Sequence, residues 1–270
     1  MALERYRALS REIKEQAPGF ETGLQIVDDL VNSLQKRGLL PKTGNFLKVK
    51  PDSAPKPEAK KYYPEIPLDE EHKRQALILA GRFAGRLGMS DEAYIATLPQ
   101  FPERPSNYSE LGLNVPVIVE TRVPWMEAAE LSGIFVTDYL KEKANAKEVS
   151  DWGDDKFEMP QVPFSAWAQD GTRFVYRKPS DVREELGKGE NKDYRAGRII
   201  DSIAIWNVHP DIIKTLFWDI IGTMVGSDDV PDLDHWDGRP ELHADQVDSA
   251  NPDFRALVLG REIRTLDLAA

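Results

Sequence analysis

The chain has 270 residues and a formal net charge of −11, and 30% of its residues are charged and 41% hydrophobic. It contains no cysteine, which excludes disulfides, thiolate-bound metals and a cysteine nucleophile, and which favours a reducing compartment. The acidic balance disfavours nucleic acid and anionic membranes as partners, and no apolar stretch reaches the ~20 residues that a bilayer span needs. We therefore expect a cytoplasmic protein that acts on neither membranes nor nucleic acid.

Two apolar stripes at helical spacing lie near the N-terminus. The first runs from Leu3 to Ile13 and the second from Phe20 to Leu34, and Gly38 suits the left-handed cap that ends a helix. This spacing predicts an N-terminal helical hairpin over residues 1–47. Because each stripe is as narrow as a coiled-coil seam, residues 1–38 could associate with a protein partner or form a homo-oligomer. The alternative is that the hairpin simply docks on the main domain.

Residues 48–67 are rich in lysine and proline. Pro51, Pro55 and Pro57 forbid a continuous helix, and the composition is typical of a semi-extended tether. The sequence therefore predicts a linker over residues 48–67 and a main domain over residues 68–270.

The first part of the main domain alternates helix and strand signals. Residues 76–87 place apolar side chains on one helical face, and Ser90 followed by two acidic residues is typical of the start of a second helix. The β-branched run 115–121 predicts a buried strand. Pro124 is typical of the first turn of a helix, which we expect to end at Leu131.

The second part contains a hairpin pattern and more helices. The segment FSAWAQDGTRFVYR alternates around Asp170-Gly171, which predicts a β-hairpin with a type I′ turn. Helices are expected over residues 180–187 and from Ile199 to just before Pro210, and residues 215–225 are interpreted as one core strand. Helices and strands follow no regular βαβ order. This mixture predicts an α+β fold with a mainly antiparallel sheet and flanking helices, preceded by the N-terminal helical hairpin.

The order of several short motifs resembles an uncharacterised family of bacterial proteins over residues 68–262. These motifs are Arg74-Gln75, the run Leu87 to Glu92, the Val115 strand, Gly226-Ser227, Val230-Pro231, Trp236, Gly238, Pro240, Leu242 and Gly260-Arg261. The family is a domain of unknown function. The resemblance therefore implies a fold and no activity.

The segment from Ser227 to Asp253 carries most of the negative charge of the chain. Nine carboxylates lie there with two histidines and a single arginine, a formal charge of −8 within the total of −11. The nine are Asp228, Asp229, Asp232, Asp234, Asp237, Glu241, Asp245, Asp248 and Asp253.

A second Asp-Gly pair, Asp237-Gly238, gives this acidic segment a geometry. If it forms a two-residue hairpin turn, Asp232 faces His243 and Asp234 faces Glu241 across the two strands. Alternation then separates the two sides of the hairpin. Leu233, His235, Pro240 and Leu242 share a core side, and Asp232, Asp234, Trp236, Arg239, Glu241 and His243 share the other side.

Two carboxylates that face each other repel unless a cation, a proton or water lies between them. A divalent metal (Mg²⁺, Mn²⁺ or Zn²⁺) would remove the repulsion, with Asp232, Asp234, Glu241 and His243 as its ligands. Alternatively, either Asp234 or Glu241 could hold a raised pKa and act as a general acid without metal. A third interpretation is a hairpin that protrudes into solvent, where the repulsion is screened.

No sequence motif of a known catalytic class is present, since the phosphate loop, the dinucleotide fingerprint, the zinc protease helix and the nucleophile elbow are all missing. Two hypotheses follow. The first is a binding or assembly protein that uses its N-terminal helical hairpin to join a partner or its own copy. The second is a metal-dependent hydrolase or other metalloenzyme centred on the hairpin of residues 232–243. The sequence does not decide whether the protein is an enzyme, and it names no catalytic nucleophile and no organic cofactor.

Overall fold

The computed structural model divides into two units, residues 1–58 and 59–270, and describes residues 67–153, 155–188, 192–215, 217–236, 238–250 and 254–266 of the second unit. The predicted N-terminal hairpin (1–47) and almost all of the predicted linker (48–67) lie outside these residues. Both therefore stay predictions.

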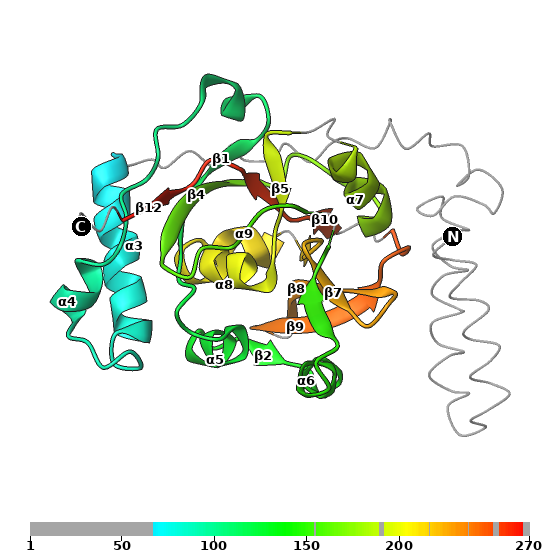
Figure 1. The fold of residues 1–270 in the computed structure, drawn as a ribbon, viewed down its shortest axis with the longest axis horizontal. Coiled ribbons are helices and arrows are strands. Elements are labelled where there is room, and N and C mark those ends of the chain that lie inside the picture. The colour runs from blue at the N-terminus through cyan, green and yellow to red at the C-terminus, as the bar shows by residue number, and fades with distance from the viewer. Residues whose placement is uncertain are drawn as a thin grey trace, which may run out of the picture. The chain divides into compact units, whose positions relative to one another are not determined.

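The described residues form an α+β domain with two sheets and confirm the predicted fold class (Figure 1). Sheet A joins five strands: β1 (Leu113–Val119), β4 (Phe164–Gln169), β11 (Val258–Gly260) and β5 (Tyr194–Ala196) in that order, with β12 (Arg264–Thr265) beside β4. All of its pairings are antiparallel.

Sheet B joins seven strands. Its path is β10 (Phe254–Ala256), β6 (Phe217–Asp219), β8 (Asp229–Trp236), β7 (Thr223–Val225) and β3 (Val149–Asp151), while β9 (Arg239–Gln246) pairs with both β8 and β2 (Phe135–Val136). Only the β10–β6 and β2–β9 pairings are parallel. Sheet B is therefore mainly antiparallel as well.

The described residues also form seven α-helices. They are α3 (Leu68–Phe83), α4 (Asp91–Ile95), α5 (Trp125–Leu131), α6 (Asp138–Asn145), α7 (Pro179–Gly187), α8 (Ile199–Val208) and α9 (Pro210–Thr215), with a 3₁₀ turn at Ser106–Ser109. Pro210 has no N–H to continue the ladder of α8, so a separate helix starts there. No helix in the described residues is long and apolar enough to cross a bilayer.

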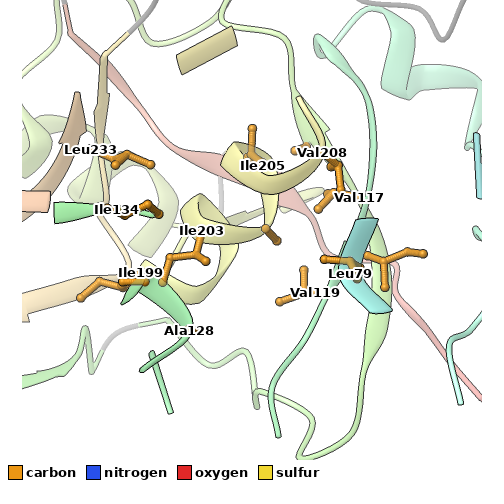
Figure 2. Packing of buried hydrophobic residues seen from close by; sticks show 14 of the residues in the cluster. Leu79, Val117, Val119, Ala128, Ile134, Ile199, Ile203, Ile205, Val208 and Leu233 are labelled. Atoms are coloured by element: carbon orange, nitrogen blue, oxygen red, sulfur yellow. The ribbon is translucent and has the colours of Figure 1, made fainter. Parts of the chain in front are cut away.

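Helix α8 forms the centre of the core. Eight of its ten residues are buried, as expected for a helix that is apolar on nearly all sides. Figure 1 shows α8 and α9 in the middle of the domain with strands on several sides of them. In Figure 2, Ile199 and Ile203 of α8 lie near Ala128 and Ile134, while Val208 lies near Val117 of β1.

Two predicted elements are wrong. The described residues of 215–225 do not form the single predicted strand: Thr215 ends α9, and β6 and β7 are two short strands that are separated by a turn at Ile221-Gly222 and that both pair with β8. Asp170-Gly171 does not join a hairpin. The Asp170 side chain accepts hydrogen bonds from the backbone N–H and the hydroxyl of Thr172. Strand β4 pairs with β1 and β11 instead.

Candidate functional site

The acidic hairpin has the predicted register. Asp232 pairs with His243, Leu233 with Leu242, Asp234 with Glu241, and Trp236 with Arg239 across β8 and β9. Gly238 takes a φ of +83°, a conformation that glycine adopts without the steric cost of a side chain. The short connection between the paired Trp236 and Arg239 therefore sets which residues share a face.

The solvent-exposed interpretation of this hairpin is wrong. Leu233 and Leu242 are fully buried in the core, and two carboxylates of the opposite side, Asp232 and Asp234, are buried too. Asp232 and Asp234 are both 0% exposed. A buried carboxylate is costly unless a proton, a cation or hydrogen bonds compensate it, so the surroundings of this pair decide what it does.

His243 bridges the two buried carboxylates. Its Nε2 lies 2.8 Å from Oδ1 of Asp232 and 2.9 Å from Oδ2 of Asp234. Nε2 carries at most one proton, so the two carboxylates compete for a single donor. The His243 side chain is 29% exposed, so the imidazole is the part of this cluster that reaches solvent.

Asp219 adds a third buried carboxyl that the sequence analysis missed. It ends β6 and lies directly opposite Asp232, so Asp219, Asp232 and His243 form one row across three neighbouring strands. The side chain is 5% exposed. A lone aspartate inside the apolar run TLFWDIIGTMV was the available signal, and the assignment of a single core strand concealed it.

The three groups of this row differ widely in proton affinity. Burial, together with the nearby Asp232 and Asp245 carboxylates, raises the pKa of Asp219 to about 8. Burial also raises the pKa of Asp232 to about 6, although His243 opposes the shift. For His243, burial would lower the pKa, but the close Asp232 and Asp234 carboxylates outweigh it and raise the pKa to about 10. Near pH 7 the row therefore holds a neutral carboxylic acid, a carboxylate and an imidazolium.

Helix α7 supports this row from the side. The guanidinium of Arg183 donates to the carbonyls of Ile221 and Thr223, which flank the turn that follows β6. Because burial outweighs the attraction of Asp219, the pKa of Arg183 falls to about 10 and the side chain stays charged near pH 7. Arg183 thus fixes the backbone next to Asp219 without forming an ion pair with it in the described residues.

Glu241, the fourth predicted metal ligand, has a different partner. Its carboxylate lies 3.5 Å from the guanidinium of Arg239, which in turn stacks 4.1 Å from the centre of the Phe135 ring. The structure brings Asp232, Asp234 and His243 together and adds Asp219. Within the residues that the structure describes, no group of three or more His, Asp or Glu side chains is arranged to hold a metal ion.

Comparison with known proteins adds no assignment. No family model, no curated protein and no solved structure matches the chain. The resemblance of residues 68–262 to an uncharacterised bacterial family stays a prediction.

Proposed function

We propose that the main domain is a metal-independent acid–base enzyme of the hydrolase type, with its centre at the row of Asp219, Asp232 and His243. The observation that carries this proposal is the separation of proton affinities within one buried row. Paired groups whose surroundings push their pKa values apart are typical of acid and base partners in catalysis.

Each group has a distinct role in this proposal. Asp219 is neutral near pH 7 and gives its proton to the leaving group of the substrate. Asp232 is ionised and takes a proton from the attacking water, so that one water molecule is consumed and both groups return to their starting states by exchanging the proton. His243, the exposed member, compensates the charge of Asp232 and covers it until the substrate arrives.

The experiment is a hydrolysis screen with nitrophenyl esters, phosphates and glycosides, repeated between pH 5 and pH 10. We expect one class to be turned over with a bell-shaped pH profile. Asp219→Asn should lower kcat/KM by about 10²-fold or more, the usual contribution of a general acid. Asp138→Asn, which changes an aspartate 92% exposed on α6, should leave the rate unchanged. No turnover of any class, or equal rates for Asp219→Asn and the wild type, would contradict the proposal.

The same screen separates this function from a metal-dependent hydrolase. The metal hypothesis is supported by the approach of Asp232, Asp234 and His243, and it needs Glu241 to leave Arg239 and join them. Dialysis against EDTA should leave the activity intact if catalysis uses protons alone. Restoration of a lost activity by Mn²⁺, Mg²⁺ or Zn²⁺ would favour the metal instead.

Assembly through residues 1–38 is a second candidate function, favoured by the coiled-coil-like spacing of Leu3 to Ile13 and Phe20 to Leu34. Deletion of residues 1–47 tests it by light scattering. We expect the full chain to have the mass of an oligomer and the shortened chain to have the mass of a monomer. Equal monomer masses, with no partner lost from pull-downs, would remove the idea.

A further inference from the structure

The polar face of the β8–β9 hairpin gathers several carboxyl groups around one imidazole. Asp232, Asp234 and Asp245 lie on this face, and Asp219 joins them from β6. Asp245 is exposed, and it acts electrostatically on both Asp219 and Asp232. Within the described residues, no lysine or arginine forms an ion pair with Asp219, Asp232 or Asp245. The His243 side chain contacts both Asp232 and Asp234.

Asp232 is incompletely satisfied even with His243 in place. It is 0% exposed, and its Oδ2 accepts no hydrogen bond in the described part of the chain. Its Oδ1 lies 2.8 Å from Nε2 of His243, a nitrogen that has one proton for two carboxylates. A fully buried carboxylate with an unused oxygen costs free energy that a better donor would recover.

The geometry around His243 indicates the shape of that donor. A single nitrogen, Nε2, reaches both carboxylates at 2.8 and 2.9 Å, the normal range of charge-assisted hydrogen bonds. A primary ammonium is also a single charged nitrogen, and it has three donors instead of one. It could serve Asp232 and Asp234 at once from one atom, whereas a planar guanidinium best matches a single carboxylate through two parallel bonds.

We propose that this face binds a primary alkylammonium group, which displaces the His243 side chain and pairs with Asp232 and Asp234, while Asp245 attracts it at the entrance. The inference rests on the proposed function, for which it supplies the substrate class: a molecule that carries a lysine-like or polyamine ammonium beside the bond that is cleaved. His243 acts as the internal cation that fills the site in the absence of substrate.

Calorimetric titration of the full chain near pH 7 tests the inference with defined probes. The probes are Nα-acetyl-lysine methylamide and spermidine, and the neutral control is the norleucine analogue of the first. We expect both ammonium probes to bind and the norleucine analogue not to bind. The stronger of the two probes then distinguishes a lysine side chain from a polyamine as the source of the ammonium.

Three variants sharpen the test. Asp232→Asn removes the unsatisfied charge and should weaken ammonium binding about tenfold or more, the equivalent of one charge-assisted hydrogen bond. His243→Ala removes the side chain that competes with the ammonium for Asp232 and Asp234. It should therefore strengthen ammonium binding about tenfold or more, because no charge-assisted hydrogen bond has to be broken first. Asp138→Asn, at an exposed position on α6, should bind as the wild type does. Circular dichroism confirms that each variant is folded.

Several outcomes would overturn the inference. They are binding of the norleucine analogue as tight as that of the lysine probe, weaker binding by His243→Ala, and unchanged binding by Asp232→Asn. Binding of Mn²⁺ but of no ammonium probe would overturn it as well. Failure of the proposed enzyme function is separate, because the hydrolysis screen and the Asp219→Asn variant report on it even when no ammonium probe binds.

Discussion

Two charged clusters lie inside this domain, and they differ in how their charges are balanced. In the first, Arg195 and Asp201 are both 0% exposed and form two parallel hydrogen bonds of 2.7 and 2.8 Å. The backbone N–H of Arg198 also donates to Asp201, and the Arg195 guanidinium lies 4.4 Å from the centre of the Phe157 ring. In the second, Asp232 and Asp234 both contact the imidazole of His243, and Asp219 lies opposite Asp232 on the neighbouring strand.

Burial alone therefore does not identify a functional cluster. The Arg195–Asp201 pair is neutral and bidentate, so each carboxylate oxygen has a donor, and its role is to join β5 to the start of α8. The Asp219 row has an excess of carboxyls and an unused oxygen on Asp232. The cluster with the excess of carboxyls is the better candidate for chemistry, because carboxyls held close together shift one another's pKa values.

The largest expected effect is on the balanced cluster. Arg195→Leu leaves Asp201 buried without its partner, and removal of one member of a buried pair typically costs about 3–5 kcal/mol. Urea unfolding measures this loss in the free energy of unfolding. Arg264→Leu, an exposed arginine on β12, should stay within about 0.5 kcal/mol of the wild type. A loss below about 1 kcal/mol for Arg195→Leu would show that the pair contributes little and would break the comparison.

The next effect distinguishes the second cluster by its pH dependence. Because the folded state raises the pKa of Asp219 from 3.8 to about 8, it binds a proton that the unfolded chain has lost between these values. The contribution of this group to stability is therefore complete below pH 3.8 and is lost as pH rises towards 8, by up to about 1.4 kcal/mol per pH unit. Asp219→Asn should remove this slope. The free energy of unfolding of the variant should therefore rise relative to that of the wild type from pH 5 to pH 8.

Unfolding in urea at several pH values measures the slope, and Asp138→Asn is the control. His243 adds a slope of the same sign at higher pH, because its contribution is complete below 6.5 and is lost as pH rises towards about 10. Equal pH dependence of Asp219→Asn and the wild type would show that Asp219 is ionised in the folded protein and would end its role as an acid.

A smaller effect is expected at Gly238, at the end of the β8–β9 hairpin that carries Asp232 and His243. Gly238→Ala places a side chain on a residue with φ of +83°, where the cost is about 1–2 kcal/mol. A Cβ at Gly238 meets no atom within 4 Å, so the backbone alone causes this loss. Gly153 is the matched control, because its Cβ also meets nothing and its φ is ordinary. Thermal unfolding should separate the two variants; equal stability would mean that the turn does not constrain the hairpin.

The smallest effect is expected at the exposed end of the same hairpin. Arg239→Ala removes an ion pair with Glu241 in which the arginine side chain is 57% exposed, and such pairs contribute at most about 1 kcal/mol. Activity and pH dependence should stay unchanged, as measured by the screen and by urea unfolding. A large change in activity or in pH dependence would indicate that Glu241 acts together with Asp232, Asp234 and His243. That result would support the metal site with four ligands.

The register of the acidic hairpin was predictable because it is a local property. The Asp-Gly pair in the sequence predicts a two-residue connection, and the two-residue period of β-strands then gives every pair from Asp232–His243 to Trp236–Arg239. The same dipeptide gave a wrong prediction at Asp170-Gly171, where no hairpin forms. There Phe174 and Tyr176 take positive φ values, which interrupt a strand, and more distant segments pair with β4.

The burial of the site was not predictable, since it depends on segments that are distant in sequence. Asp219 reaches Asp232 through the pairing of β6 with β8, and α7 brings Arg183 to the turn after β6. Periodicity gives the face on which a residue lies. It does not show which segments cover that face. The sequence therefore predicted the face on which Asp232 and Asp234 lie, but it did not predict that they are buried.

The position of β11 in sheet A has a consequence for how the chain is made. This strand lies between β4 and β5, although it follows them in the sequence by about sixty residues or more. During synthesis, which proceeds from the N-terminus, β4 and β5 therefore emerge long before the strand that joins them. Their unpaired edges have to be kept from neighbouring chains until residues 258–260 leave the ribosome. A nascent chain halted before this point should be a strong client of chaperones, and release of the last strand should end that dependence.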